Sequence, residues 1–532
     1  MYIYDCLYGE MDFDKIVYQC MLTPEMQRLR EVRLGNINSL FLTGSANINR
    51  FEHSVGTAYL AKINVEYNNK QLTKQEKNKL ILAALFHDIA NGPFGHSYEY
   101  LCEKQGFNPE KNIGSVINCI FEGAYKKSAS LETIYFGQYN QIGRILKKEE
   151  VKEIDNIVAG KDKQFSKLIS DVIDLDNIDN VFRMAYHMGI SFAKQAPIEL
   201  AQGMMCEKNE IYFKENVLPY LYEWYYTRIK VYKMLLYNPQ DFAAKCMLSE
   251  IMEVVLKNNP TRIKWYYTDY QLVSLLKDME EIWTNQLVEV KKEKDINWNF
   301  EEIQESKEHV ARILKEGYGL ELGKKEEIEV NKVSKKIGFA IYNTEYELTE
   351  SKLLKVKKGS VNVTNIVTRM MTGDLYGCLA IMRTKKLEYS ESFLDMSSRC
   401  ELEEQCNNAI YEEIGNKDIT IAFHAIVDRS KTKRQLNIKY LTGEEVQIGE
   451  STREMLIGVF IKNPKYGLSK GKKLGVDKRK KCIQTICAVF GKIGLDDLEN
   501  VKLYDEVKFS VQGVQTRLKR NDRFEISDRV AN

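Results

Sequence analysis

The stretch at residues 80–99, LILAALFHDIANGPFGHSYE, constrains the fold of this chain more than any other segment. Its first seven residues are apolar, which predicts a buried helix. The helix ends in a doublet, His87 and Asp88, and the Asn-Gly-Pro that follows breaks it. An adjacent imidazole and carboxylate can offer one nitrogen and one oxygen ligand to a divalent cation. They can equally form a hydrogen bond inside the core, so the doublet alone leaves both interpretations open.

A second histidine follows the turn, and a carboxylate comes three residues after it. His96 and Glu99 share one face if this segment is helical, because residues three apart are neighbours on a helix. Glu99 could hold one ring nitrogen of His96 and leave the other free for proton transfer. The pair is therefore a candidate for acid–base chemistry.

Two further segments supply possible partners for the doublet. His53 lies near the start of an amphipathic helix at residues 49–61, and it is the only histidine before the doublet in a chain that has six. Residues 171–190 show apolar residues at helical spacing, with four aspartates among the first nine positions. Asp179 can pair with Arg183 one turn away, whereas Asp176 has no local partner of that kind. His53 and Asp176 could thus complete a metal shell of two nitrogens and two oxygens.

Together, these motifs resemble those of the HD-domain phosphohydrolases, and among them the deoxynucleoside triphosphate triphosphohydrolases. The resemblance rests on RFEHS at residues 50–54, on the doublet and the turn after it, and on residues 174–190, and it covers roughly residues 1–260. It implies one metal ion with the ligands His53, His87, Asp88 and Asp176. It also implies that His96 and Glu99 are a catalytic pair. Arg50, Arg228 and Tyr232 would contact the phosphates or the sugar.

The chain departs from the enzymes that it resembles at positions near the substrate. Asn177, Asn180 and Met184 stand where the sterile-alpha-motif-and-HD enzyme of animal cells has Lys, Tyr and Asp. Asn91 instead matches the bacterial deoxyguanosine triphosphate hydrolases. We add Asn91 and Asp179 to the predicted substrate contacts. The departures leave the metal ligands intact, but they leave the preference for base and sugar open.

The reaction that the resemblance implies is hydrolysis of a deoxynucleoside triphosphate to deoxynucleoside and inorganic triphosphate, with a divalent ion such as Mg, Mn or Fe. One alternative is another HD phosphohydrolase, a nucleotidase or a phosphodiesterase. A second alternative is an HD protein that senses nucleotide or nucleic acid with weak or no turnover. The resemblance also suggests a nucleotide effector and a homo-oligomer.

The predicted fold is mainly α, with an HD-type helical core followed by a mixed α/β C-terminal domain. A chain of 532 residues is too long for one hydrophobic core, so several domains are expected. We expect the HD domain at 1–290, a charged helical connector at 291–335, and an α/β domain with a regulatory or assembly role at 336–532. Apolar runs at 337–342, 419–427 and 455–461 predict strands in this last domain.

The composition narrows the range of partners. A formal net charge of +2 argues against a polyanion or membrane partner for the whole molecule, so a basic site must be local. The cluster at residues 470–481 could bind a nucleotide or nucleic acid, or it could be a solvated surface. Eleven cysteines without a CxxC pair indicate reduced thiols. With no signal segment and no long apolar run, a cytoplasmic location is expected.

Overall fold

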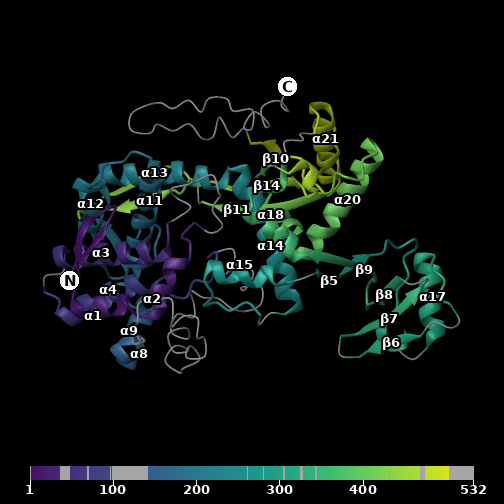
Figure 1. The fold of residues 1–532 in the computed structure, drawn as a ribbon, viewed down its shortest axis with the longest axis horizontal. Coiled ribbons are helices and arrows are strands. Elements are labelled where there is room, and N and C mark those ends of the chain that lie inside the picture. Colours follow the sequence, from purple (N-terminus) through teal and green to yellow (C-terminus); the bar gives the residue numbers. More distant parts are fainter. Residues whose placement is uncertain are drawn as a thin grey trace.

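A computed structural model of the protein describes residues 2–35, 48–68, 71–95, 98, 142–259, 262–279, 281–303, 306–323, 327–332, 334–341, 344–430, 432–467 and 474–501. Within these ranges the fold is mainly helical, as predicted, and the longer strands lie in the C-terminal half (Figure 1). The predicted catalytic pair, His96 and Glu99, and residues 470–473 of the basic cluster lie outside the described residues.

The N-terminal region is a group of helices flanked by two short hairpins. In chain order its elements are β1 (Tyr2–Asp5), β2 (Gly9–Asp12), α1 (Lys15–Met21), α2 (Pro24–Arg28), α3 (Arg50–Asn68), α4 (Lys74–Phe86), α8 (Ile142–Ile145), α9 (Lys148–Val158), α10 (Ser166–Ile169), α11 (Leu175–His187), α12 (Ala196–Gly203), β3 (Met204–Glu207), β4 (Glu210–Phe213) and α13 (Leu218–Leu236).

Helix α3 is central to this region, because it packs against α4, α11 and α12. Every residue of α4 from Leu80 to Phe86 is buried, which confirms the buried helix that the apolar run predicts. A capping box between Thr73 and Glu76 fixes the start of α4, since each side chain satisfies a backbone N–H that the helix cannot. Because α4 and α11 pack on α3, the C-terminal end of α4 and the N-terminal end of α11 lie beside the first turn of α3.

The C-terminal region joins helices to a four-stranded antiparallel sheet with the order β11-β14-β10-β15. Its elements are α14 (Pro239–Asn258), α15 (Asp269–Lys277), α18 (Val363–Met371), β10 (Gly377–Thr384), α19 (Glu391–Leu394), α20 (Met396–Ile414), β11 (Ile421–Arg429), β12 (Leu436–Lys439), β13 (Glu445–Ile448), β14 (Arg453–Ile461), α21 (Val476–Lys492) and β15 (Glu499–Asn500). Strand β14 is buried on both faces, because Leu456 and Phe460 pack with α14 while Ile457 and Val459 pack with α20 and α21. A strand covered on both sides needs a continuous apolar run, which is why the sequence reveals it.

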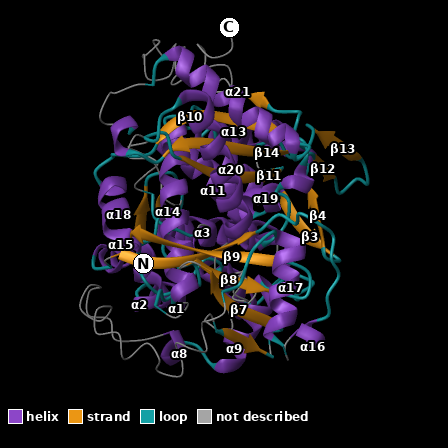
Figure 2. Ribbon diagram, turned by 90° about the vertical axis from the view of Figure 1, so that its right-hand side faces the viewer, coloured by secondary structure: helices purple, strands orange, loops and turns teal. Residues whose placement is uncertain are grey.

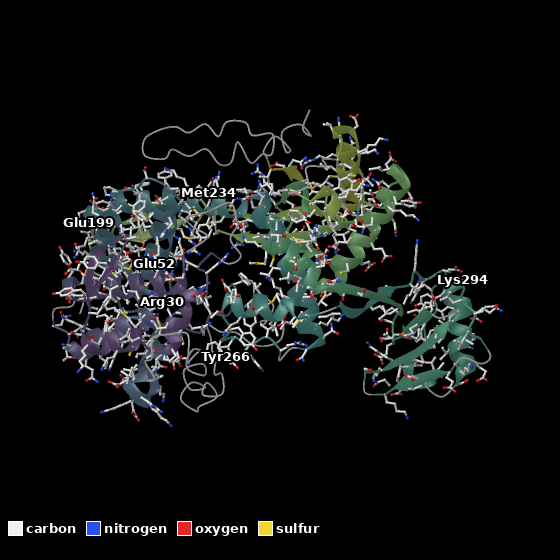
Figure 3. The ribbon with its side chains drawn as sticks, in the orientation of Figure 1. Arg30, Glu52, Glu199, Met234, Tyr266 and Lys294 are labelled. Atoms are coloured by element: carbon white, nitrogen blue, oxygen red, sulfur yellow. The ribbon has the colours of Figure 1, made fainter. Side chains whose placement is uncertain are left out.

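A smaller lobe lies beside the C-terminal region and is reached through the long paired strands β5 and β9 (Figures 1 and 2). Its elements are β5 (Glu281–Glu289), α16 (Phe300–Ile303), α17 (Lys307–Tyr318), β6 (Ile328–Asn331), β7 (Lys336–Ile341), β8 (Thr344–Leu348) and β9 (Leu353–Asn362). The sheet order is β5-β9-β8-β7-β6, and α17 shares a core with β7 through Val310, Ile313 and Leu314. Figure 3 shows Lys294 on this lobe, far from Glu52 in the N-terminal region.

The predicted strands are confirmed by β7, β11 and β14. The expected boundaries at residues 290 and 335 stay predictions, and β6 and β7, which lie on either side of residue 335, pair in one sheet. No helix in the described ranges has both the length and the apolar character that crossing a bilayer requires.

Candidate metal centre

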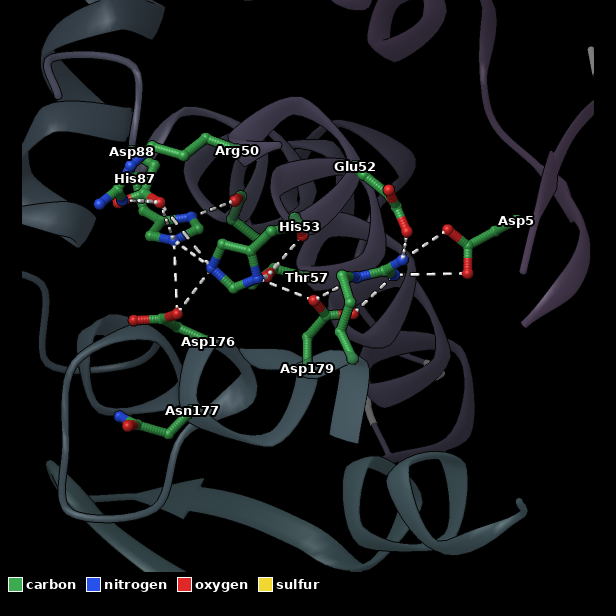
Figure 4. Close-up of polar contacts among 12 residues, drawn as sticks. Asp5, Arg50, Glu52, His53, Thr57, His87, Asp88, Asp176, Asn177 and Asp179 are labelled. Atoms are coloured by element: carbon green, nitrogen blue, oxygen red, sulfur yellow. Dashed lines mark hydrogen bonds and ion pairs between the residues drawn. The ribbon is translucent and has the colours of Figure 1, made fainter. Parts of the chain in front are cut away.

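Four donor side chains from three helices meet at one point in the N-terminal region (Figure 4). His53 projects from the first turn of α3, and His87 follows the last residue of α4 with Asp88 next to it. Asp176 lies in the first turn of α11, whose N-cap is Asp174: the Asp174 side chain accepts a hydrogen bond from the Asn177 amide at 2.6 Å. Helix ends thus place all four of the predicted metal ligands.

The distances between the donor atoms suit a single ion. The Nε2 atoms of His53 and His87 lie 3.2 Å apart. Asp176 Oδ1 lies 2.9 Å from His53 Nε2 and 3.5 Å from His87 Nε2. Asp88 Oδ2 lies 3.8 Å and 3.7 Å from the same two nitrogens. Ligands held about 2.0–2.2 Å from one cation stand roughly 3–4 Å from each other, so each of these separations suits a shared centre, and His53, His87 and Asp176 form its tightest group.

The outer hydrogen bonds of the two histidines fix which nitrogen faces this centre. His53 Nδ1 donates to Asp179 Oδ2 at 2.7 Å, and His87 Nδ1 donates to the Ala84 carbonyl oxygen at 2.7 Å. Both partners only accept, so in the neutral rings each Nε2 presents a lone pair. Two lone pairs and two carboxylate oxygens this close repel each other unless positive charge lies among them, either as a metal ion or as a proton on Nε2. The donor set therefore fits a divalent metal ion.

Arg50 and Asn91 hold the Asp88 carboxylate from both sides. Arg50 donates to Asp88 Oδ2 at 2.6 Å, and the Asn91 side-chain amide donates to Asp88 Oδ1 at 2.7 Å. Burial raises the pKa of Asp88, but Arg50, His87 and His53 outweigh this and lower it to about 2. The carboxylate is thus ionised, as a ligand must be. Arg28, which is fully buried, in turn donates to the Ile89 and Asn91 carbonyls and holds the turn after the doublet.

Asp179 has a different place from the one that we expected. It is fully buried, and its oxygens accept hydrogen bonds from His53, Tyr8 and Arg183, the last as the predicted pair one turn away. Each of its two oxygens already accepts two hydrogen bonds, and the side chain is closed to solvent, which leaves no place for a substrate contact. The prediction of a substrate contact at Asp179 is therefore corrected: this carboxylate orients His53.

We expect the affinity for a divalent ion to fall as the pH falls. Burial lowers the pKa of His53, but Asp176 and Asp179 outweigh it and raise the pKa to about 10 in the ion-free protein. Below that pH a proton occupies Nε2, and the ion must displace it. Each displaced proton weakens apparent binding by about tenfold per pH unit. Isothermal titration in buffers of different ionisation enthalpy would count the released protons, and a pH-independent affinity would contradict a protonated His53.

Arg228 and Tyr232, predicted to contact phosphate or sugar, lie on α13. Arg228 is 2% exposed, and its guanidinium stacks over the Tyr232 ring at 4.4 Å. Its Nε and Nη1 atoms have no hydrogen-bond partner among the described residues. Because a buried charged donor without a partner is costly, these N–H groups fit an anion such as a phosphate. Trp224 donates to the Asn177 carbonyl at 3.1 Å and ties α13 to the start of α11.

Arg434 is a residue that sequence analysis missed. It donates to the Val172 carbonyl at 2.9 Å, just before α11. Burial is the main cause that lowers the pKa of Arg434, and the positive charge of Arg228 lowers it further. An anion bound at Arg228 would offset this repulsion between the two cations. Nothing in the local sequence sets Arg434 apart, because the α/β region brings it here from far along the chain.

Residues 50–184 match a family model described as "HD domain", and this segment contains all four donors. Among relatives, "Uncharacterized protein YwfO" of Bacillus subtilis is 24% identical over 45% of this chain and 52% of its own length. "Deoxynucleoside triphosphate triphosphohydrolase SAMHD1 homolog" of Dictyostelium discoideum is 24% identical over 44% and 45%. "Deoxynucleoside triphosphate triphosphohydrolase SAMHD1" of Bos taurus is 27% identical over 42% and 42%. The chain spans about half the length of these relatives.

Solved structures share the fold over most of the chain. A hypothetical protein from Aquifex aeolicus superposes with a TM-score of 0.52 at 15% identity, covering 86% of this chain and 96% of its own. A phosphohydrolase from Bacteroides thetaiotaomicron gives a TM-score of 0.52 at 12% identity, covering 87% and 100%. At such identities the likeness extends to the fold alone.

Proposed function

We propose that the chain is a metal-dependent phosphohydrolase that hydrolyses deoxynucleoside triphosphates to deoxynucleoside and inorganic triphosphate, because residues 50–184 match an HD domain and relatives with this activity match nearly half of the chain. The observation that carries the proposal is the meeting of two imidazole lone pairs and two carboxylates at one centre. The substrate class is drawn from the SAMHD1 relatives, which are named deoxynucleoside triphosphate triphosphohydrolases.

We assign the ion to His53, His87, Asp88 and Asp176. A divalent ion there supplies Lewis-acid activation of a phosphate ester and of water. The protein keeps the ligands in place, because Asp179 orients His53 while Arg50 and Asn91 orient Asp88. Without these contacts the donors could turn away from the centre.

Arg228, with Arg434 beside it, would bind the phosphate chain. A triphosphate brings several negative charges, and it would satisfy the buried N–H groups of Arg228. Stacking on Tyr232 fixes the plane of the Arg228 guanidinium, which favours bidentate contact with phosphate oxygens. His96, with Glu99 holding its ring, would transfer a proton at the P–O bond that forms or breaks.

A product screen tests the proposal. The full chain would be incubated with each of the eight common ribo- and deoxyribonucleoside triphosphates and with Mg²⁺, Mn²⁺ or Fe²⁺. Release of intact inorganic triphosphate from deoxynucleotides is expected. Release of orthophosphate from monophosphates, or cleavage of a phosphodiester, would favour another HD phosphohydrolase instead. Saturable nucleotide binding without turnover would favour a sensor. A nucleotide effector and a homo-oligomer, both suggested by the resemblance, stay proposals.

Replacing Arg228 by methionine is expected to weaken substrate use while metal binding stays intact. The substitution keeps length and packing on Tyr232 but removes the charged N–H donors. The loss of one or two charge-assisted hydrogen bonds should lower kcat/KM by roughly 10- to 1,000-fold. Lys230→Met, which removes a half-buried cation from the same helix, is the matched control. Equal kinetics in the two variants would remove Arg228 from the phosphate site.

A further inference from the structure

A second group of metal-type donors lies next to the first centre, on a different side of α3. Cys6 comes from the turn between β1 and β2, Glu52 from α3, and His187 is the last residue of α11. Figure 4 shows Glu52 pointing away from His87 and Asp176. The Cys6 sulfur lies 3.3 Å from Glu52 Oε1 and 3.4 Å from His187 Nε2, and these last two atoms lie 3.0 Å apart.

We propose that Cys6, Glu52 and His187 form a second cation site, which takes a zinc-type ion. Thiolate, imidazole and carboxylate are the three ligand types that zinc prefers. In a tetrahedral set with bonds of about 2.0–2.3 Å, the ligand atoms stand roughly 3.3–3.7 Å from one another. The three observed separations are close to this spacing. Small side-chain adjustments would therefore complete three corners of a tetrahedron.

The charges around this cluster also favour a dication. The buried side chain of Arg183 lies next to this cluster. Arg183 donates to Glu52 at 2.7 Å, to Asp5 at 2.8 Å and to Asp179 at 2.9 Å. Three carboxylates therefore surround one guanidinium. A carboxylate oxygen has room for both an N–H donor and an ion, so Arg183 does not block Glu52.

Solvent access separates this cluster from the first centre. Cys6 is exposed, and the side chains of Glu52 and His187 are each 24% exposed, whereas that of His53 is 1% exposed. An ion can enter from solvent, and water can fill the fourth position. On binding, the Cys6 S–H bond breaks, its proton passes to solvent, and the sulfur becomes the ligand.

An ion bound at this site would link the hairpin of β1 and β2 to α3 and α11, the two helices that also carry His53 and Asp176. Helices α3 and α11 carry His53 and Asp176 at their first turns, while Glu52 and His187 lie on the same two helices. Arg183 further links Glu52 to Asp179, which orients His53. Zinc should therefore raise the thermal stability of the protein through Cys6 even when the first centre is disabled.

Cobalt(II) absorption tests the site, because a thiolate ligand gives a near-ultraviolet charge-transfer band that nitrogen and oxygen ligands alone do not. The Asp176→Ala variant should show this band with one equivalent of cobalt and the full chain with two equivalents, because the first centre also takes up the ion, and zinc should remove the band by competition. Cys6→Ser should abolish the band. Cys206→Ser, which changes another partly exposed cysteine, should keep it.

His187→Gln provides an independent check if Cys6→Ser disturbs the hairpin. Loss of one of three ligands should weaken cobalt and zinc binding about tenfold or more. No thiolate band in the full chain, or a band that survives Cys6→Ser, would overturn the proposal. A band with unchanged affinity in His187→Gln would also overturn the assigned ligand set.

Discussion

Replacing Asp176 by alanine is expected to abolish metal retention and hydrolysis together. Asp176 supplies the carboxylate nearest to both histidine nitrogens, at 2.9 Å from His53 and 3.5 Å from His87. Without it the centre keeps two neutral nitrogens and only Asp88, which already accepts from Arg50 at 2.6 Å. We expect metal affinity to fall roughly 100-fold or more and turnover roughly 1,000-fold or more.

The fold should survive this substitution. The Asp176 side chain is 30% exposed, and Asp174, not Asp176, caps α11. Asp171→Ala is the matched control, because Asp171 precedes the same helix and pairs with Lys167 at 3.4 Å, away from the donors. Metal content measured after gel filtration, circular dichroism and triphosphate release should be compared in the two variants. Full metal occupancy in Asp176→Ala would show that the fourth ligand is misassigned.

The metal donors could be proposed from the sequence because together they match the motifs of the HD-domain phosphohydrolases. Taken alone, the His87-Asp88 doublet fits a core hydrogen bond equally well. The orienting contacts could not be predicted in this way. Asp179 has the spacing of an ordinary ion pair with Arg183, and only the packing of α3 on α11 brings it to His53. Arg434 is separated from α11 by nearly half of the chain.

The same distinction holds for the fold. The run at 455–461 in β14 is apolar throughout, and the run at 419–427 in β11 has only Thr420 and His424 as polar residues, because helices cover both faces of their sheet. Residues 291–335 carry so many charges that they suggest a solvated connector. Yet α17 has an apolar stripe, including Val310 and Leu314, that packs on a sheet from later in the chain. The sequence of such a charged segment indicates a narrow apolar stripe, but it does not indicate which sheet the stripe packs against.

Replacing Asp179 by asparagine is expected to weaken metal binding although none of the four metal ligands is changed. Asp179 Oδ2 accepts from both His53 Nδ1 and Arg183, and Oδ1 accepts from Tyr8 and Arg183. An amide has only one acceptor oxygen. If its NH₂ group faces His53, Nδ1 must become the acceptor and the proton moves to Nε2, where it blocks the ion. If the NH₂ group takes the place of Oδ1 instead, it opposes the Arg183 Nη2 and Tyr8 donors in a fully buried place.

Either arrangement should lower metal affinity by roughly 10- to 100-fold, the usual effect of losing a group that orients a ligand. Competition with a chromophoric chelator would measure this, with Asp171→Asn as the matched control. The double variant Asp176→Ala with Asp179→Asn makes the test sharper. If Asp179 acts on turnover through the same ion, the double variant should be no less active than Asp176→Ala alone. Additive losses in activity would mean instead that Asp179 contributes to turnover by a route that does not pass through the metal centre.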